Sequence, residues 1–449
     1  MSTHKVLLLG SGFVAKPCLD ILVKTGIQVT VACRTVETAR KLVGELEGVS
    51  PIALDVEDTA VLDAEVAKHD LVVSLIPYIH HPIVIKSAIR NKKHVVTTSY
   101  VSRAMMELDA QAKAAGITVM NEIGLDPGID HLYAVKMIDE VHAAGGKIIS
   151  FLSYCGGLPA PEDSDNPLGY KFSWSSRGVL LALRNSAKYW KDGKIEEISG
   201  PKLMEAAKPY FIYPGYAFIA YPNRDSTEYR ERYNIPEAET IIRGTLRYQG
   251  FAEFIKAFVD LGFLDDTPVE FLTKTSQPLT WKETVARTLR IESTIEEDLI
   301  YAISKATTFS NEAEKIRVIN GLRWVGFFSD EKVTPRGNLL DTLCATLEAK
   351  MQYGPNERDL VMLQHKFEIE LADGKRETRT STLVDYGIPG GYSSMAKLVG
   401  VPCGVAVKQI LNGTITDRGV LAPMNVKLNN PLIKELKEEY GIECIEKTI

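Results

Sequence analysis

The stretch "LLLGSGFVAK" (residues 7–16) decides the fold of the N-terminal part of the chain. An apolar run leads into Gly10 and Gly12, and Ala15 takes the third position of the pattern G-x-G-x-x-[GA]. In that pattern the first glycine makes a tight turn, the second lets the backbone approach a pyrophosphate, and the third small residue lets helix and strand pack closely. The pattern is short, and the alternative interpretation is an ordinary strand–helix turn.

The residues that follow alternate between short apolar runs and helical segments. Runs of Val, Ile and Leu are typical of strands buried on both faces of a parallel sheet. We expect strands at residues 5–10, 28–34, 51–55, 70–77, 94–100 and 117–122. We expect helices at residues 13–24, 37–46, 59–68, 82–91, 102–115 and 127–143. This order predicts an α/β chain with a Rossmann-type doubly wound parallel sheet, and it favours dinucleotide binding at residues 7–16.

The pattern changes after residue 145. We expect a long strand at 147–159 that ends in a glycine loop, and another strand at 240–251. Residues 252–357 are mostly helical in pattern, and a long hairpin turns at Asp373-Gly374. Residues 393–413 read as an amphipathic helix pair that folds back onto the first domain. The second domain is therefore predicted to be α+β, with a helical insert.

These patterns predict three domains. The Rossmann domain covers 1–130 and is completed by 390–449; the α+β substrate and dimerisation domain covers 131–254 and 356–389; the helical subdomain covers 255–355.

Composition and net charge limit the kinds of molecule that the protein is expected to bind. The chain has 449 residues and a formal net charge of -6. That mild acidity argues against nucleic acid or an anionic membrane as partner, because both attract basic patches. The six cysteines are scattered without a C-x-x-C pair, which predicts reduced thiols in a cytoplasmic protein and no metal site.

The end of the second strand indicates which dinucleotide binds. Enzymes that use NAD carry an acidic residue there, which holds the ribose 2′-hydroxyl. Here Cys33 takes that place, followed by Arg34 and Thr35. Arg34 can pair with a 2′-phosphate, so NADP(H) is the predicted cofactor, and a solvated strand-end arginine is the alternative.

Other cofactor contacts are expected where strands end, because ligands bind at the carboxyl edge of such sheets. Asp55 ends the third strand, where it either reaches the adenine side or caps the next helix. The full set expected from the loop and the strand ends is Gly10, Ser11, Gly12, Phe13, Val14, Cys33, Arg34, Thr35, Asp55, Ser74, Leu75, Thr98 and Ser99.

Several further motifs resemble one family. They are "TTSY" (97–100), "NEIGLDPGIDHL" (121–132), "YCGGLP" (154–159), "FSWSSRG" (172–178), "PNRDS" (222–226), "GTLRYQGF" (244–251) and "SSMAKLVGVP" (393–402). In order and spacing they resemble the saccharopine dehydrogenases, above all the fungal NADP-dependent, glutamate-forming branch. The resemblance implies that L-glutamate and α-aminoadipate 6-semialdehyde condense to an imine, which NADPH reduces to saccharopine during lysine biosynthesis. It also implies a cytosolic homodimer, and it adds Leu125, Asp126 and Ser175 to the cofactor contacts.

A substrate with three carboxylates and a primary ammonium needs fixed charges. Arg224 and Arg247 can each bind a carboxylate bidentately, with Thr245 beside Arg247, although each arginine also fits a structural ion pair. Asp126 before Pro127 fits a helix N-cap, and the resemblance implies that it also holds the substrate ammonium. The predicted substrate contacts are Ser99, Tyr100, Asp126, Arg224, Thr245 and Arg247.

Imine chemistry moves protons, so acid–base groups are expected near the nicotinamide. The candidate catalytic residues are Tyr100, Asp126 and Cys155, although Tyr100 also fits a packing role and Cys155 a small buried residue. The adjacent His80 and His81 are not expected to be functional, because neighbours in sequence do not converge on one ligand.

Two alternatives stay open. One is a related imine reductase with another substrate, and the other is an NADPH sensor without turnover. The presence of Asp126, Arg224 and Arg247 together favours an enzyme.

Overall fold

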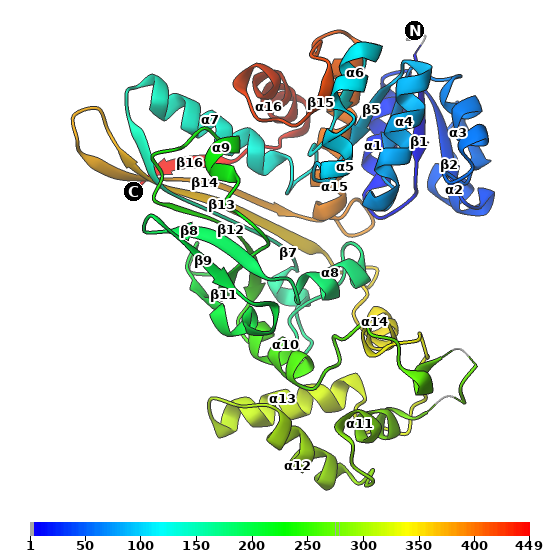
Figure 1. Cartoon of the computed structure of the whole chain (residues 1–449), viewed down its shortest axis with the longest axis vertical. Helices are drawn as coiled ribbons and strands as arrows, with labels where there is room; N and C mark the ends of the chain where they lie inside the picture. Colours follow the sequence, from blue (N-terminus) through cyan, green and yellow to red (C-terminus); the bar gives the residue numbers. More distant parts are fainter. Residues whose placement is uncertain (1–3, 274, 278) are drawn as a thin grey trace.

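Two β-sheets organise the chain in this computed structural model, which describes residues 4–273, 275–277 and 279–449 (Figure 1). The first sheet is parallel, with strand order β15-β6-β5-β4-β1-β2-β3. Its strands are β1 Lys5–Leu9, β2 Gln28–Cys33, β3 Val49–Ala53, β4 Leu71–Ser74, β5 His94–Thr97, β6 Thr118–Met120 and β15 Gly419–Leu421. The predicted doubly wound order is confirmed, and β15 adds a seventh strand from the far end of the sequence.

Helices cover both faces of this sheet. They are α1 Ala15–Lys24, α2 Val36–Val43, α3 Thr59–Val66, α4 His81–Asn91, α5 Arg103–Met106, α6 Asp109–Ala115 and α15 Ser394–Leu411. α7 Ile129–Ala143 packs against β7 and β13 of the second sheet, and α16 Val426–Tyr440 packs on α7 and α15. The single helix predicted over 102–115 is in fact two, α5 and α6, and Ser102 caps the first by accepting from the Met105 amide.

The predicted helix pair at 393–413 is wrong, because α15 is one continuous helix. It packs on α1 at Gly400, where a Cβ atom would lie 2.6 Å from the carbonyl oxygen of Val14, so only glycine permits this approach. Among the described residues, α15 is also the one helix long and apolar enough to cross a membrane, yet 78% of it is buried inside the fold. It is therefore a core helix of the first domain.

The second sheet is mixed and runs β10-β11-β12-β7-β13-β14-β16, with β8 and β9 attached to its side. Its strands are β7 Lys147–Pro159, β8 Ala187–Lys191, β9 Lys194–Ile198, β10 Lys208–Tyr210, β11 Phe218–Pro222, β12 Thr240–Tyr248, β13 Asp359–Glu370, β14 Arg376–Tyr386 and β16 Ile445–Thr448. The hairpin predicted around Asp373-Gly374 is confirmed as β13–β14. The glycine loop predicted at the end of β7 is wrong: Gly156 and Gly157 lie inside the strand, where Gly156 lets Leu246 of β12 come close.

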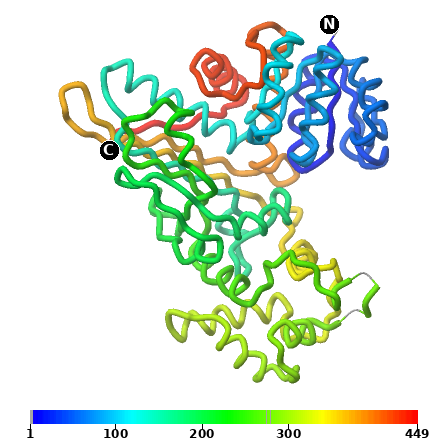
Figure 2. The backbone as a smooth tube through the Cα atoms, viewed as in Figure 1, coloured from blue at the N-terminus to red at the C-terminus, as the bar shows by residue number. Residues whose placement is uncertain are grey.

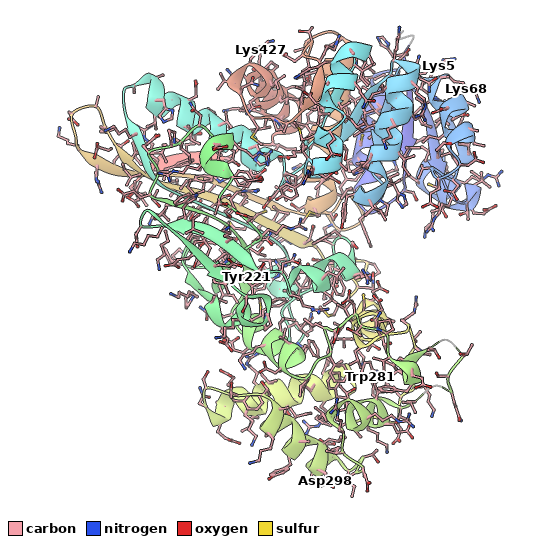
Figure 3. The ribbon with its side chains drawn as sticks, in the orientation of Figure 1. Lys5, Lys68, Tyr221, Trp281, Asp298 and Lys427 are labelled. Atoms are coloured by element: carbon pink, nitrogen blue, oxygen red, sulfur yellow. The ribbon has the colours of Figure 1, made fainter. Side chains whose placement is uncertain are left out.

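Helices between β12 and β13 form a separate layer at the end of the molecule remote from the first sheet (Figure 1). They are α10 Phe251–Asp260, α11 Trp281–Leu289, α12 Glu296–Ala306, α13 Glu312–Val325 and α14 Leu339–Lys350. Two short helices that precede β12, α8 Ser176–Ala182 and α9 Tyr229–Arg232, lie nearer the second sheet (Figure 1). Short 3₁₀ turns are η1 Tyr78–His80, η2 Pro161–Asp163, η3 Gly200–Lys202, η4 Met204–Ala206 and η5 Glu270–Leu272. Trp281 stacks on Phe327 at 5.2 Å in the core of this layer (Figure 3).

The chain crosses between the two sheets three times. The crossings follow α7, β14 and α16, and the last strand, β16, pairs with β14 beside the C-terminus (Figure 2). Within the 390–449 segment assigned to the Rossmann domain, β16 thus lies in the other sheet. Glycines with positive φ occupy all three crossings: Gly145, Gly390 and Gly441.

Candidate active site

The glycine loop has the shape that a dinucleotide requires. Gly10 has φ 101°, and a Cβ there would lie 2.7 Å from the carbonyl oxygen of Leu75, so the turn admits only glycine. A Cβ on Gly12 would meet nothing within 4 Å, which leaves open space over the loop. α1 begins at Ala15 without a side-chain cap; the Ala15 amide donates to the carbonyl of Gly12 at 3.1 Å and Pro17 has no N–H, so in the first turn the Lys16 amide is left for an anion. The loop residues therefore fit a pyrophosphate.

The residues after β2 leave a cation at the predicted 2′-phosphate position. Cys33 is buried, whereas Arg34 and Thr35 are exposed. Within the described residues Arg34 forms no ion pair, and Thr35 Oγ1 lies 2.6 Å from Thr38 Oγ1. An exposed, unpaired arginine beside two hydroxyls suits a phosphate.

Asp55 is not the cap of the next helix. Asp58 takes that role by accepting from the Val61 amide at 3.1 Å, while Asp55 accepts from the Glu57 amide at 3.0 Å. The capping role predicted for Asp55 is therefore wrong, and its contact with the adenine side stays a prediction.

Strands β4 and β5 end side by side at the same edge of the sheet. Ser74, Leu75, Thr98 and Ser99 lie there, as predicted from the strand ends. The hydroxyls of Ser74 and Ser99 both lie 2.9 Å from nitrogens of His81. His81, for which we expected no function, is thus built into this edge.

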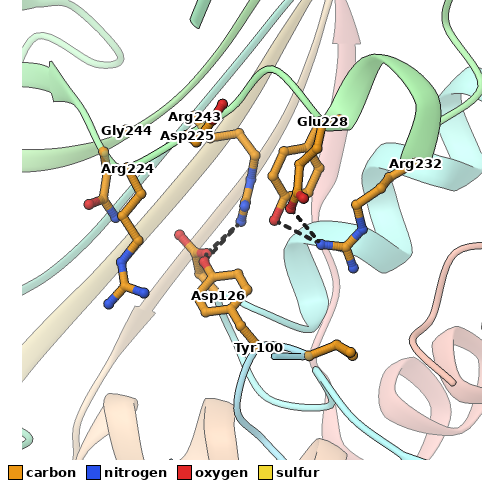
Figure 4. Close-up of a pocket in the computed structure, with 11 residues that line it drawn as sticks. Tyr100, Asp126, Arg224, Asp225, Glu228, Arg232, Arg243 and Gly244 are labelled. Carbon is orange, nitrogen blue, oxygen red and sulfur yellow. Dashed lines mark hydrogen bonds and ion pairs between the residues drawn. The ribbon is translucent and has the colours of Figure 1, made fainter. Parts of the chain in front are cut away.

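A cavity of about 240 Å³ opens between the two sheets (Figure 4). It is lined by Tyr100, Val101, Asp126, Asn223, Arg224, Asp225, Glu228, Tyr229, Arg232, Arg243 and Gly244. Three predicted site residues meet here. The Tyr100 hydroxyl donates to Asp126 Oδ1 at 2.7 Å, and the Arg224 guanidinium lies 5.7 Å from the centre of the Tyr100 ring.

Arg243 of β12 is the central residue that the sequence analysis missed. Its Nη2 donates to Asp126 Oδ1 at 2.7 Å and to the Tyr100 hydroxyl at 3.3 Å (Figure 4). The same nitrogen donates to Asp130 Oδ2 at 2.5 Å. Its guanidinium also stacks on the Tyr229 ring at 4.3 Å. "TIIRGTLRYQGF" contains two arginines four residues apart, and only the partners in the fold tell which one binds protein carboxylates.

The interpretation of Asp126 as a helix cap is wrong. α7 begins at Ile129 with Gly128 as its N-cap, and Asp130 accepts from the Gly128 amide at 2.6 Å. The amides of Ile129 and Asp130 donate to the carbonyls of Gly124 and Leu125, so residues 124–128 form a turn that precedes the helix. The Asp126 carboxylate is left to interact with Tyr100 and Arg243 in the cavity.

The pKa values of Asp126 and Asp130 are shifted in opposite directions. Burial raises the pKa of Asp126 against the opposing effect of Arg243. Burial also acts to raise the pKa of Asp130, but His131 and Arg243 outweigh it, so that pKa lies below its ordinary value. Asp130 is therefore the fixed anion, and Asp126 is the carboxyl group suited to take up a proton.

Glu122, His131 and Arg232 form a second ionic group, and Arg232 lines the cavity. Glu122 is fully buried, with Oε2 lying 2.7 Å from Arg232 Nη2 and 2.8 Å from His131 Nε2. Burial opposes ionisation, but His131 and Arg232 hold the pKa of Glu122 at about 2. The His131 Nδ1 atom lies 2.6 Å from the Tyr233 hydroxyl, which fixes the orientation of the ring.

Arg247 lies further along β12 and has no anionic partner. It is 6% exposed, it stacks on Tyr170 at 4.8 Å, and its Nη1 donates to the backbone carbonyl of Leu246 at 2.8 Å. Throughout the described ranges no carboxylate lies within ion-pair distance of it, and its Nε has no partner. A buried guanidinium without a counter-ion is costly, so this position calls for an anionic ligand.

Cys155 and Thr245 lie opposite each other on β7 and β12. Burial raises the pKa of the Cys155 thiol, so it stays protonated at neutral pH. Leu125 is buried next to Asp126. Ser175 caps α8 by accepting from the Gly178 amide at 3.2 Å, and its side chain is exposed.

Comparison with known proteins identifies the family. Residues 6–120 match the model described as "Saccharopine dehydrogenase NADP binding domain", and residues 124–442 match "Saccharopine dehydrogenase C-terminal domain". The chain belongs to the saccharopine dehydrogenase family. The predicted family, the α/β fold class and NADP(H) as cofactor are thereby confirmed.

Individual members of the saccharopine dehydrogenase family are similar over their whole length. The chain is 68% identical to "Saccharopine dehydrogenase [NADP(+), L-glutamate-forming]" of Pyricularia oryzae, covering 100% of both chains. It is 63% identical to the protein of that name from Saccharomyces cerevisiae, over 99% of both. The solved apo saccharopine dehydrogenase (L-Glu forming) from Saccharomyces cerevisiae has a TM-score of 0.93 at 62% identity, covering 99% of this chain and 100% of that one.

Proposed function

We propose that this protein is an NADP-dependent, glutamate-forming saccharopine dehydrogenase. It reduces the imine of L-glutamate and α-aminoadipate 6-semialdehyde to saccharopine, reversibly, in lysine biosynthesis. The observation that carries the proposal is Arg247, a buried guanidinium without a counter-ion on the same strand as Arg243, which binds Asp126 and Tyr100 in the cavity. A polycarboxylate substrate supplies the missing anion.

The charges in the cleft match such a substrate. Arg247 and Arg224 have no protein carboxylate and are free to bind two substrate carboxylates, Arg247 in the interior and Arg224 at the exposed rim. Arg243 is already neutralised by Asp126 and Asp130, so it orients protein groups. Thr245, between the two β12 arginines, offers a hydroxyl to the same ligand.

In this reaction the side chains of the protein donate and accept the protons. Bound NADPH supplies the hydride for the imine carbon. The imine nitrogen must gain a proton as the carbon is reduced, and the hydrogen-bonded pair of Tyr100 and Asp126 can deliver it. Asp126 suits this exchange because burial raises its pKa, while Arg243 holds its carboxylate in place. The protonated Cys155 thiol is a further donor beside Thr245.

The direct test is turnover. The purified protein is mixed with saccharopine and NADP⁺, or NAD⁺ in parallel, and absorbance at 340 nm is followed. We expect NADPH formation with NADP⁺ strongly preferred. Tight NADPH binding without turnover would favour a sensor, and turnover only with another amine would favour a related imine reductase.

We further propose that the protein is a cytoplasmic homodimer and that the three predicted domains, with β16 assigned to the second domain, are its structural units. The family resemblance supports the dimer. Sedimentation velocity at micromolar concentration tests it, and a mass of one chain would contradict it.

A further inference from the structure

His81 is the first residue of α4, and its ring joins the carboxyl ends of two neighbouring strands. Nδ1 lies 2.9 Å from Ser74 Oγ at the end of β4. Nε2 lies 2.9 Å from Ser99 Oγ and 3.1 Å from Thr97 Oγ1 at the end of β5. His81 is 1% exposed, whereas its neighbour His80 turns away toward Glu57 at 3.7 Å. The two histidines therefore face different surroundings.

The His81 ring has a single proton to share. Burial, with a smaller effect from His80, lowers the pKa of His81 to about 4, so the imidazole is neutral at pH 7. A neutral imidazole donates from one nitrogen and accepts at the other. The tautomer therefore decides whether the hydroxyl of Ser99 accepts from the ring or donates to it.

The two tautomers present different groups to the cleft. With the proton on Nε2, the ring donates to Ser99 and accepts from Ser74, so the Ser99 hydroxyl proton is free to point outward. With the proton on Nδ1, Ser99 as the nearest hydroxyl donates to Nε2 and offers only lone pairs. The Thr97 hydroxyl already accepts from the Ser99 amide at 3.2 Å, which fixes the backbone of Ser99 in both cases.

The ligands of this cleft carry phosphates and carboxylates, which only accept hydrogen bonds. We propose that His81 is a positioning residue: its Nε2–H tautomer, held by Ser74, makes Ser99 a hydrogen-bond donor to the anionic ligand at the strand edge. The identity of that ligand rests on the proposed function. The half-buried Ser99 follows β5 and stands next to Tyr100 of the cavity, at the strand edge where the ligand is expected to bind.

Two near-isosteric variants separate this role from packing. In His81→Gln the amide nitrogen replaces Nε2–H and keeps the donor to Ser99. In His81→Asn the amide replaces Nδ1 and keeps only the contact with Ser74. We expect His81→Gln to bind NADPH and saccharopine within about threefold of wild type, and His81→Asn to weaken one of the two ligands about tenfold, as for the loss of a hydrogen bond to a charged group. His80→Asn is the matched control and is expected to change nothing.

A double-mutant cycle with Ser99→Ala tests the coupling. If His81 acts through Ser99, the pair His81→Asn and Ser99→Ala binds no more weakly than Ser99→Ala alone. Additive losses would overturn the proposal, as would equal losses in His81→Gln and His81→Asn. Dissociation constants come from NADPH fluorescence and from calorimetry with saccharopine, and melting temperatures show whether each variant is folded.

A spectroscopic readout separates this inference from the proposed function. In protein labelled with ¹⁵N-histidine, the His81 ring nitrogens in the NADPH complex are expected to show the Nε2–H tautomer; the Nδ1–H tautomer would refute the inference. Absence of saccharopine turnover in the wild-type enzyme would refute the proposed function alone, because NADPH binding and the tautomer are measured without turnover.

Discussion

Replacing Arg247 with methionine should damage substrate binding while leaving the fold intact. A bidentate contact between arginine and a carboxylate consists of two hydrogen bonds to a charged group, each contributing about 1.5 kcal/mol. Losing both costs about 3 kcal/mol, which is roughly a hundredfold in KM for saccharopine. KM for NADP⁺ should not change, because Arg247 lies on β12 of the second sheet, away from the glycine loop.

Stability should respond differently. The variant loses the stacking of the guanidinium on Tyr170 and Phe251, at 4.8 Å and 5.3 Å, but it also removes a buried charge that lacks a counter-ion. Methionine sulfur restores part of the aromatic contact. We expect the free energy of unfolding in urea to change by less than about 1 kcal/mol.

Arg243→Met is the matched contrast on the same strand. It leaves Asp126 and Asp130 buried without their cation, so we expect a loss of about 3–5 kcal/mol of unfolding free energy. The assays are urea unfolding and steady-state absorbance at 340 nm on both variants. If Arg247→Met lost as much stability as Arg243→Met and kept a normal KM for saccharopine, the reasoning on unpaired buried charge would be refuted.

Three further perturbations follow from the same structure. Arg34→Ser should raise KM for NADP⁺ at least tenfold and leave KM for NAD⁺ unchanged, which parallel assays would show; equal effects on both cofactors would exclude Arg34 as the 2′-phosphate contact. Glu122 has its pKa lowered to about 2, so its contribution of about 3 kcal/mol is present above the unfolded pKa near 4.3 and is lost as pH falls toward 2. Urea titrations from pH 6 to pH 2 should show this fall in wild type and a flatter profile in Glu122→Gln. Gly400→Ala should cost about 1–3 kcal/mol because its Cβ would lie 2.6 Å from the Val14 carbonyl oxygen, and an unchanged melting temperature would contradict that packing.

Local patterns predict much of the first sheet, because each of its first six strands carries its own apolar run. β15 has no such signal: Gly419–Leu421 is short and joins β6 across about three hundred residues of sequence, through a parallel register that only the fold specifies. The predicted start of α7 is too early because Asp126-Pro127 fits a helix start, while backbone bonds to the carbonyls of Gly124 and Leu125 make residues 124–128 a separate turn. Local propensity carries no information about such a competing partner.

The candidate site likewise contains residues that the sequence predicts and residues that only the fold reveals. Tyr100, Asp126 and Arg224 were expected from their motifs, and they line one cavity. Arg243 was missed because an arginine on a strand looks the same whether it faces two aspartates or a ligand. His81 was set aside because residues adjacent in sequence point apart; that divergence is what buries His81 between two strand ends and leaves His80 near the surface.

The three glycine-bearing crossings between the sheets have a mechanical consequence. A domain joined to its neighbour by one linker can swing in many directions, but one joined at three points can move only in ways that all three connections accommodate. Gly145, Gly390 and Gly441 each have positive φ, and each lies where the backbone leaves one sheet for the other. Any movement of one sheet relative to the other must therefore turn all three joints together. The apolar core shared by strands of both sheets restricts that movement further.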